Sequence, residues 1–201
     1  MSKTCLYYFA PHSPWTYLGH ARFVEMAKRH GVQVDVRPLD LGRVFGASGG
    51  LPLAKRAPQR QAYRLAELAR WSAFLGVPMN VQPKFFPVSP DAAAKLIVAT
   101  RLAHGVDAAL DLAQAIMRGL WAEERNIGDE ETLIQIANSC ELDGRMLVKT
   151  AATASVQAEY DRNTDEANGA SVFGSPWYIV DGESFWGQDR LDFVERAMSK
   201  Q

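Results

Sequence analysis

β-Strand patterns occur only near the two ends of this chain, which restricts its folds more than any other feature. Residues 4–10, TCLYYFA, are a short aromatic run ended by proline, which is typical of a buried strand. Residues 32–41, VQVDVRPLDL, alternate valines with polar residues, the period of a half-buried strand. Residues 14–31 between them show helical spacing and stop at Gly31. This order predicts a βαβ unit with parallel strands.

The middle of the chain shows helical periodicity instead. Residues 41–58 are rich in glycine, alanine and proline, and we expect a loop there. Helices are expected at residues 60–76, 91–104, 106–124 and 130–140, with one or two more within residues 143–169. A proline-rich connection, residues 77–90, separates the first of these helices from the rest.

β-Character returns only near the end. Trp177–Val180 and Ser184–Trp186 flank Asp181-Gly182, a dipeptide typical of a tight hairpin turn. A helix is expected to follow, from about Asp189 to Lys200.

The order βαβ, helical block, ββα predicts an α/β, thioredoxin-like fold with a large all-helical insertion. Residues 1–40 and 171–201 are expected to form a discontinuous thioredoxin-like domain. Residues 41–170 would form the inserted helical domain. A chain of 201 residues can bury a substantial core without disulfides.

Composition excludes several classes of function. With 47% hydrophobic residues and a net charge of −1, the chain is neither disordered nor a general binder of nucleic acid. Cys5 and Cys140 form no CxxC or metal-ligand pattern, so we expect no metal and two free thiols in a reducing compartment. We find no signal-peptide pattern and no run long enough to span a membrane. A soluble cytoplasmic protein without a membrane partner is expected.

The tripeptide Ser-Pro-Trp occurs twice, first at residues 13–15, where the first strand leads into the first helix. Ser13 followed by proline is typical of a helix N-cap. In a thioredoxin fold this junction carries C-x-x-C, and Ser13 and Thr16 stand where the two cysteines would be. Disulfide exchange needs thiolates, so that chemistry is absent here. A serine hydroxyl at a helix N-terminus can instead donate a hydrogen bond to the thiolate of another molecule.

The second Ser-Pro-Trp, at residues 175–177, precedes a strand. Pro176 is either a trans proline at the first position of the strand or, as the predicted fold suggests, a cis proline. In that fold this loop packs beside the start of the first helix. The backbone of Ser175 should therefore face Ser13.

Four segments together resemble a known family. They are YYFAPHSPWTYLG, GGLPLAKRAPQRQAYRLAELARWSAFLGVP, PKFFP and VFGSPWYIVDGESFWGQDRLDFVERA. They resemble 2-hydroxychromene-2-carboxylate isomerases, which are close to kappa-class glutathione transferases within the DsbA-like branch of the thioredoxin superfamily. The resemblance covers nearly the whole chain. One departure is Ala10, where the family often has an acidic residue.

The resemblance implies glutathione as the cofactor. Ser13 would donate a hydrogen bond to its thiolate, and the main chain at Ser175, before Pro176, would pair with the cysteinyl backbone. The γ-glutamyl end would be bound by Trp186, Gly187, Gln188 and Asp189. Asp189 also fits an N-cap of the last helix, with Asp192 completing an imperfect capping box.

The implied reaction is isomerisation of 2-hydroxychromene-2-carboxylate to trans-o-hydroxybenzylidenepyruvate, in naphthalene-type aromatic breakdown, through reversible thiolate addition. A small carboxylate substrate needs a cation, and among the basic residues of the helical block Lys84 and Arg60 are the first choices. A kappa-like glutathione transferase that conjugates electrophiles is the alternative, and a non-catalytic binding protein is a third. A homodimer is one expected assembly.

We predict that the chain is redox-inert, because neither Ser13 nor Thr16 supplies a thiolate. Insulin reduction and dithiol oxidation assays should show background activity only. Robust disulfide exchange that disappears when Cys5 or Cys140 is replaced would overturn this prediction.

Overall fold

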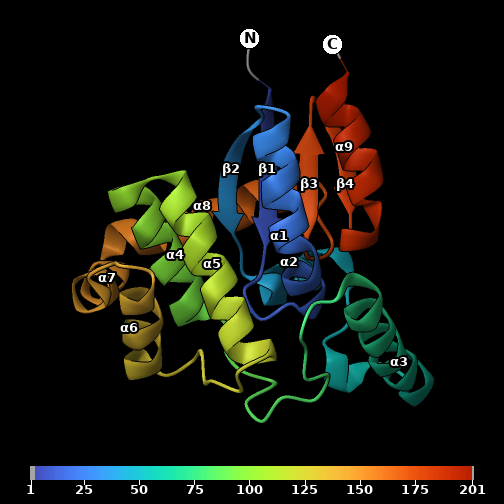
Figure 1. The fold of residues 1–201 in the computed structure, drawn as a ribbon, viewed down its shortest axis with the longest axis horizontal. Coiled ribbons are helices and arrows are strands. Elements are labelled where there is room, and N and C mark those ends of the chain that lie inside the picture. The colour runs from blue at the N-terminus through green and yellow to red at the C-terminus, as the bar shows by residue number, and fades with distance from the viewer. Residues whose placement is uncertain (1–2, 201) are drawn as a thin grey trace.

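The computed structural model describes residues 3–200 of the chain. Its strands, within these residues, form one sheet in the order β2-β1-β3-β4 (Figure 1). They are β1 (Thr4–Phe9), β2 (Gln33–Pro38), β3 (Trp177–Val180) and β4 (Glu183–Trp186). β1 is parallel to β2 and antiparallel to β3, and β3 is antiparallel to β4. The predicted βαβ and ββ units are confirmed.

Helices make up most of the remaining chain. The α-helices are α1 (Pro14–Arg29), α2 (Leu41–Ser48), α3 (Pro58–Leu75), α4 (Asp91–His104), α5 (Val106–Trp121), α6 (Glu130–Ser139), α7 (Gly144–Ala151), α8 (Ala154–Gly169) and α9 (Leu191–Ser199). Two short 3₁₀ helices are η1 (Leu53–Lys55) and η2 (Gln188–Arg190). The thioredoxin-like, DsbA-type fold expected from the order of elements is confirmed.

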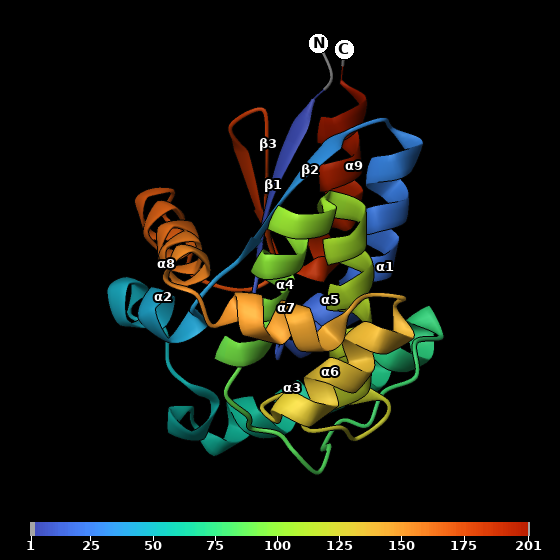
Figure 2. The same cartoon turned by 90° about the vertical axis from the view of Figure 1, so that its left-hand side faces the viewer.

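Helices cover both faces of the sheet (Figure 2). Tyr7 and Tyr8 are consecutive on β1, so their side chains point to opposite faces. Tyr7 packs in the larger core with residues of α1 and α9, whereas Tyr8 packs in a smaller core with residues of α2 and α8. Burial on both sides explains why β1 reads as an unbroken apolar run rather than an alternating one.

The inserted helices share these cores with the sheet. α4 and α5 supply many residues of the larger core, and both contact β2. α2 and α8 supply Val44 and Ala167 to the smaller core. The division into a thioredoxin-like domain and an inserted domain stays a prediction, and the two parts are packed continuously.

The loop expected at residues 41–58 is wrong over its first half, which forms α2. Asp40 caps this helix, because its carboxylate accepts hydrogen bonds from the backbone N–H groups of Gly42 (2.8 Å) and Arg43 (3.1 Å). Val44 is fully buried in the smaller core. The cap and this tertiary contact outweigh the weak helix propensity of the glycines.

The N-cap expected at Asp189 is also wrong. Asp189 lies inside η2, its side chain makes no capping hydrogen bond, and α9 begins only at Leu191. The backbone N–H of Gly187 donates to the carbonyl of Pro176 (3.0 Å), and Arg190 N–H donates to the carbonyl of Gly187 (3.2 Å). The second bond closes a tight turn before the helix begins, and the first ties the start of that turn to the residue before β3.

A buried histidine connects β1, α1 and α5. The Nε2 of His20 lies 3.0 Å from the carbonyl oxygen of Leu110, and its Nδ1 lies 2.9 Å from the hydroxyl of Tyr7. Because a carbonyl only accepts, Nε2 carries the proton and Nδ1 accepts from Tyr7. Burial lowers the pKa of His20 to about 4, so the ring is neutral in the folded protein near neutral pH.

We predict that His20 makes the protein less stable as the pH falls from about 6.5 towards 4. The unfolded chain binds a proton at His20 in this range and the folded chain does not, so protonation favours unfolding. Urea unfolding at pH 7 and at pH 4.5 measures how much the free energy of unfolding decreases between these two pH values. This decrease should be about 2 kcal/mol smaller in His20→Gln than in the wild type. The exposed His104→Gln is the control and should leave this loss unchanged, and an equal effect of the two variants would contradict the prediction.

Candidate active site

The two Ser-Pro-Trp copies meet where α1 begins. Ser13 is the N-cap of α1, and its Oγ accepts a hydrogen bond from the backbone N–H of Thr16 (3.3 Å). The same hydroxyl donates to the carbonyl oxygen of Ser175 (3.2 Å). The Ser175–Pro176 peptide bond is cis. The expected helix cap, cis proline and contact between Ser175 and Ser13 are all confirmed.

A second hydroxyl of the C-x-x-C frame also contacts Ser175. Thr16 Oγ1 lies 2.9 Å from Ser175 Oγ, which in turn accepts from the backbone N–H of Ala10 (2.9 Å). Ser13, Thr16 and Ser175 are all buried. The hydroxyls that replace the two cysteines are thus held in one hydrogen-bonded cluster.

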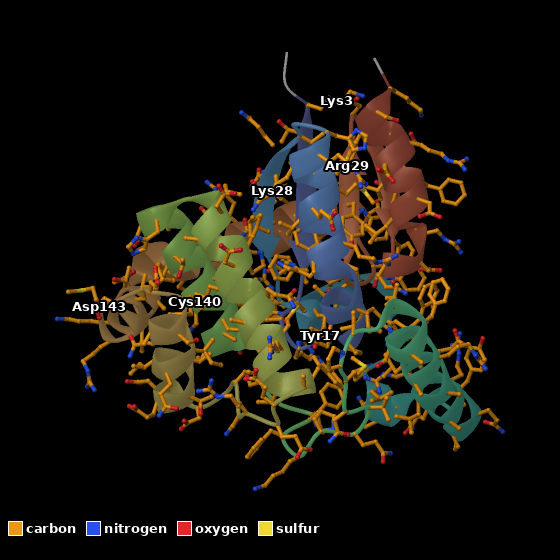
Figure 3. The ribbon with its side chains drawn as sticks, in the orientation of Figure 1. Lys3, Tyr17, Lys28, Arg29, Cys140 and Asp143 are labelled. Carbon is orange, nitrogen blue, oxygen red and sulfur yellow. The ribbon has the colours of Figure 1, made fainter. Side chains whose placement is uncertain are left out.

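The two thiols of the chain lie elsewhere. Cys5 is buried in β1, and burial raises its pKa to about 12, so it stays protonated near neutral pH. Cys140 follows α6 and lies away from Tyr17, which marks the first turns of α1 (Figure 3). Within residues 3–200, no group of three or more histidine, cysteine and acidic side chains is arranged to hold a metal ion. No helix in that part of the chain has the length and hydropathy needed to cross a bilayer.

A cavity of about 890 Å³ opens beside Ser13. Its walls come from the start of α1, from α2 and the segment after it, from α3, from the loop before α4, and from the segment before β3. The residues that line the cavity include His12, Ser13, Trp15, Ser48, Arg56, Arg60, Arg64, Phe86, Phe173, Gly174, Ser175 and Trp186. The start of α1 and the segment before β3 supply Ser13 and Ser175, and most of the other lining residues come from between α2 and the loop before α4.

Trp186 forms part of the cavity wall and is 52% exposed. Its ring meets the ring of Phe173 edge-on, with centroids 4.8 Å apart. Gly174 makes this position accessible, since a Cβ there would lie 2.3 Å from Trp186 Nε1. The indole therefore lies directly against the backbone next to Ser175.

The other residues expected at the γ-glutamyl end do not line the cavity. Gln188 is 2% exposed, and its Oε1 accepts from Arg22 (2.6 Å), so its side chain points into the protein. Asp189 is exposed, with its carboxylate 3.5 Å from the Arg190 guanidinium. Gly187 connects this turn to Pro176 through its backbone N–H. Asp189 thus offers an accessible carboxylate near Trp186, whereas Gln188 offers no free side-chain oxygen.

The two basic residues expected to bind substrate lie in different places. Arg60 lines the cavity. Lys84 does not line it; its side chain is exposed, with Nζ 5.1 Å from the ring centroid of Phe85. Arg56 and Arg64 also line the cavity and were not among the first choices. For Arg64 the available signal was its spacing of four residues from Arg60, which places the two side chains on one helical face. Arg56 precedes α3, so this spacing does not apply to it.

His12 lines the cavity next to Ser13 in sequence. Burial lowers its pKa to about 4, so the ring is neutral near pH 7. In the described part of the chain, no hydrogen bond joins His12 to Ser13, whose hydroxyl contacts Ser175 and Thr16. The pair therefore lacks the serine–histidine contact of a hydrolase.

Comparison with known proteins places these features in a family. The model of the DSBA-like thioredoxin domain matches residues 5–199. A 2-hydroxychromene-2-carboxylate isomerase of Sphingobium xenophagum is 30% identical over 97% of both chains. The glutathione S-transferase kappa 2 of Caenorhabditis elegans is 25% identical, over 96% of this chain and 90% of that protein. A solved 2-hydroxychromene-2-carboxylate isomerase structure superposes with a TM-score of 0.83 at 24% identity, over 97% of this chain and 94% of that one.

Proposed function

Because this chain belongs to the DsbA-like thioredoxin-domain family and, within it, to the 2-hydroxychromene-2-carboxylate isomerases, we propose that its isomerase reaction depends on glutathione. The reaction would convert 2-hydroxychromene-2-carboxylate to trans-o-hydroxybenzylidenepyruvate. The natural setting would be the breakdown of naphthalene-type aromatic compounds.

One observation carries the proposal: the hydroxyl of Ser13 replaces the reactive thiol and donates to the carbonyl of Ser175. A hydroxyl at the N-terminus of α1 can hydrogen-bond a thiolate but cannot form a disulfide with it. The site therefore suits a thiol compound that is used and released unchanged.

The hydrogen bonds around Ser13 support the proposal that glutathione binds there. A serine hydroxyl donates one hydrogen bond at a time, so donation to a thiolate releases the carbonyl of Ser175. That carbonyl is then free to accept an N–H from an extended peptide backbone, as when a strand is added to a sheet. Gly174 leaves room for Trp186 beside this path, and the carboxylate of Asp189 beyond it would suit the ammonium of the γ-glutamyl end.

Bound glutathione would supply a thiolate that adds reversibly to the conjugated double bond, which allows rotation about that bond. Ser13 would stabilise the thiolate by its hydrogen bond, and the dipole of α1 would act in the same direction. The cavity wall from α2, α3 and the loop before α4 would shield the reacting atoms from bulk water. One of its arginines would bind the substrate carboxylate.

A kappa-like transferase is the second candidate, favoured by the match to the Caenorhabditis elegans kappa 2 protein over 96% of this chain. The same serine and the same cavity would serve it. The two functions differ in the fate of glutathione, which an isomerase regenerates and a transferase consumes. Mass spectrometry of the products separates them.

We predict that Ser13→Ala slows turnover roughly ten- to a hundredfold near neutral pH. A hydrogen bond to a charged group contributes about 1.5–3 kcal/mol, so its loss should raise the thiol pKa of bound glutathione by roughly one to two units. Higher pH should restore part of the activity, because more of the thiol is then ionised. The loss of the helix cap should cost at most about 1 kcal/mol of stability.

The measurement is the pH–rate profile at saturating glutathione, followed by ultraviolet absorbance of the chromene. Ser48→Ala is the matched control, since Ser48 also lines the cavity but its hydroxyl bonds to the carbonyl of Val44 (2.8 Å). It should keep the wild-type profile. Turnover by the wild type without glutathione, or no alkaline recovery in Ser13→Ala, would contradict the proposal.

A second prediction concerns Gly174. In Gly174→Ala the new methyl group would lie 2.3 Å from Trp186 Nε1, so the indole must move away from the backbone beside Ser175. Glutathione should then bind roughly ten times more weakly, about 1.4 kcal/mol, as measured by calorimetry. Gly169→Ala is the control, because no atom lies within 4 Å of its added Cβ. Equal glutathione affinity in both variants would show that Trp186 is not part of the binding site.

A further inference from the structure

Arg64 is a partly buried cation that has no counter-ion among the residues the structure describes. It lies on α3, where many neighbouring side chains are exposed. In residues 3–200, its guanidinium takes part in no ion pair and no hydrogen bond. By contrast, Arg43 in the same basic stretch pairs with Asp161 (2.9 Å) and Asp165 (2.6 Å) of α8. Arg56 and Arg64 are therefore both partly removed from water without receiving a counter-charge, and of these two only Arg56 donates a hydrogen bond within residues 3–200.

Arg64 lies at the border of two cavities. It lines the cavity beside Ser13 and also a second cavity of about 320 Å³, lined in part by Gln61, Val81 and Pro83. Phe86 lines both cavities as well. Arg64 and Phe86 thus stand together where the two spaces adjoin.

Aromatic rings hold this guanidinium in place. Its central carbon lies 5.2 Å from the ring centroid of Phe86 and 5.9 Å from that of Trp121, which is fully buried. Such contacts attract a cation but provide no acceptor oxygen. The N–H donors of Arg64 stay available to a ligand, in the planar arrangement that matches a carboxylate.

Electrostatics favour an anion at this point. Burial and, to a smaller extent, the nearby charge of Arg56 together lower the pKa of Arg64 to about 10. Burial is the main cause of the lowered pKa of His12; the charges of Asp91 and Asp40 oppose it, and the charge of Arg64 adds to it, so Arg64 acts electrostatically on the residue next to Ser13. A carboxylate next to Arg64 would offset the cost of the buried charge and would lie within one cavity with Ser13.

The other basic residues are less suited to this role. Arg60 lines the same cavity but is exposed, so its charge is hydrated and attracts a carboxylate less strongly. Arg56 already donates its Nε–H to the carbonyl of Leu51 (2.8 Å). Lys84 lines neither cavity.

We propose that Arg64 is the carboxylate receptor of the cavity and selects planar conjugated acids, whose flat part lies against Phe86. The identity of the natural acid rests on the proposed function, whereas the binding itself does not. Arg64 would thereby orient the substrate relative to Ser13. It is a specificity-determining residue in this scheme and takes no part in proton transfer.

The test measures binding rather than turnover. Trans-cinnamate and its neutral analogue cinnamamide, which share one planar skeleton, are titrated into the full-length protein by calorimetry at pH 7. The wild type should bind cinnamate at least about tenfold more tightly than cinnamamide, the effect of one charge-assisted hydrogen bond. Arg64→Gln should abolish this preference, and Arg64→Lys should restore part of it.

Arg60→Gln is the matched control, since Arg60 lies one helical turn away on the same wall. It should keep the preference within about twofold. Circular dichroism and thermal unfolding verify that each variant is folded. If Arg64→Gln does not fold, the ligand preference of Arg64→Lys tests the proposal instead. An unchanged preference in the folded Arg64 variants, or no preference in the wild type, overturns the inference.

Turnover of the chromene carboxylate separates this inference from the proposed function. If the wild type does not turn over this substrate, and the Arg64→Gln variant lacks the preference for cinnamate that the wild type shows, the isomerase proposal fails and the proposed role of Arg64 stands. If the wild type is active and Arg64→Gln and Arg60→Gln raise KM equally, the isomerase proposal stands and the special role of Arg64 is overturned.

Discussion

The antiparallel pairing of β3 with β1 is the constraint on which the rest of the site depends. Tyr8 and Trp177 are register partners near the carboxyl end of β1, so the residues before β3 come to lie beside those that follow β1. Ser175 therefore meets Ala10, Ser13 and Thr16, about 160 positions earlier in the chain. Without this pairing, the start of α1 would be an ordinary capped helix terminus.

Hydroxyl groups in place of two thiols change what this junction can do. Ser13 and Thr16 bond to Ser175 at distances of 2.9–3.2 Å, and each hydroxyl can exchange its partner by rotation alone. A disulfide would instead require electrons to enter and leave. The junction keeps the anion-favouring end of α1 and loses the redox chemistry, so any thiol used here must come with a ligand.

The segment from α2 to the loop before α4 gives the cavity its arginines and much of its wall. Ser13 precedes α1 and Ser175 precedes β3. Arg56 directly follows η1, and Arg60 and Arg64 lie on α3. Ser13, Ser175 and these three arginines thus line one cavity. A conjugated acid held between them would present its double bond near Ser13, which unites the proposed reaction and the proposed role of Arg64.

Local sequence patterns determined the order of strands and helices, the cap at Ser13 and the absence of thiol chemistry, because each follows from residues close together in the chain. Tertiary contacts decided the rest. α2 forms because Val44 is buried, Gln188 turns inward because Arg22 binds it, and Lys84 stays outside a cavity that Arg64 enters. The burial and the bonding partners of these side chains depend on residues that are far away in the sequence. Local periodicity and composition therefore cannot predict them.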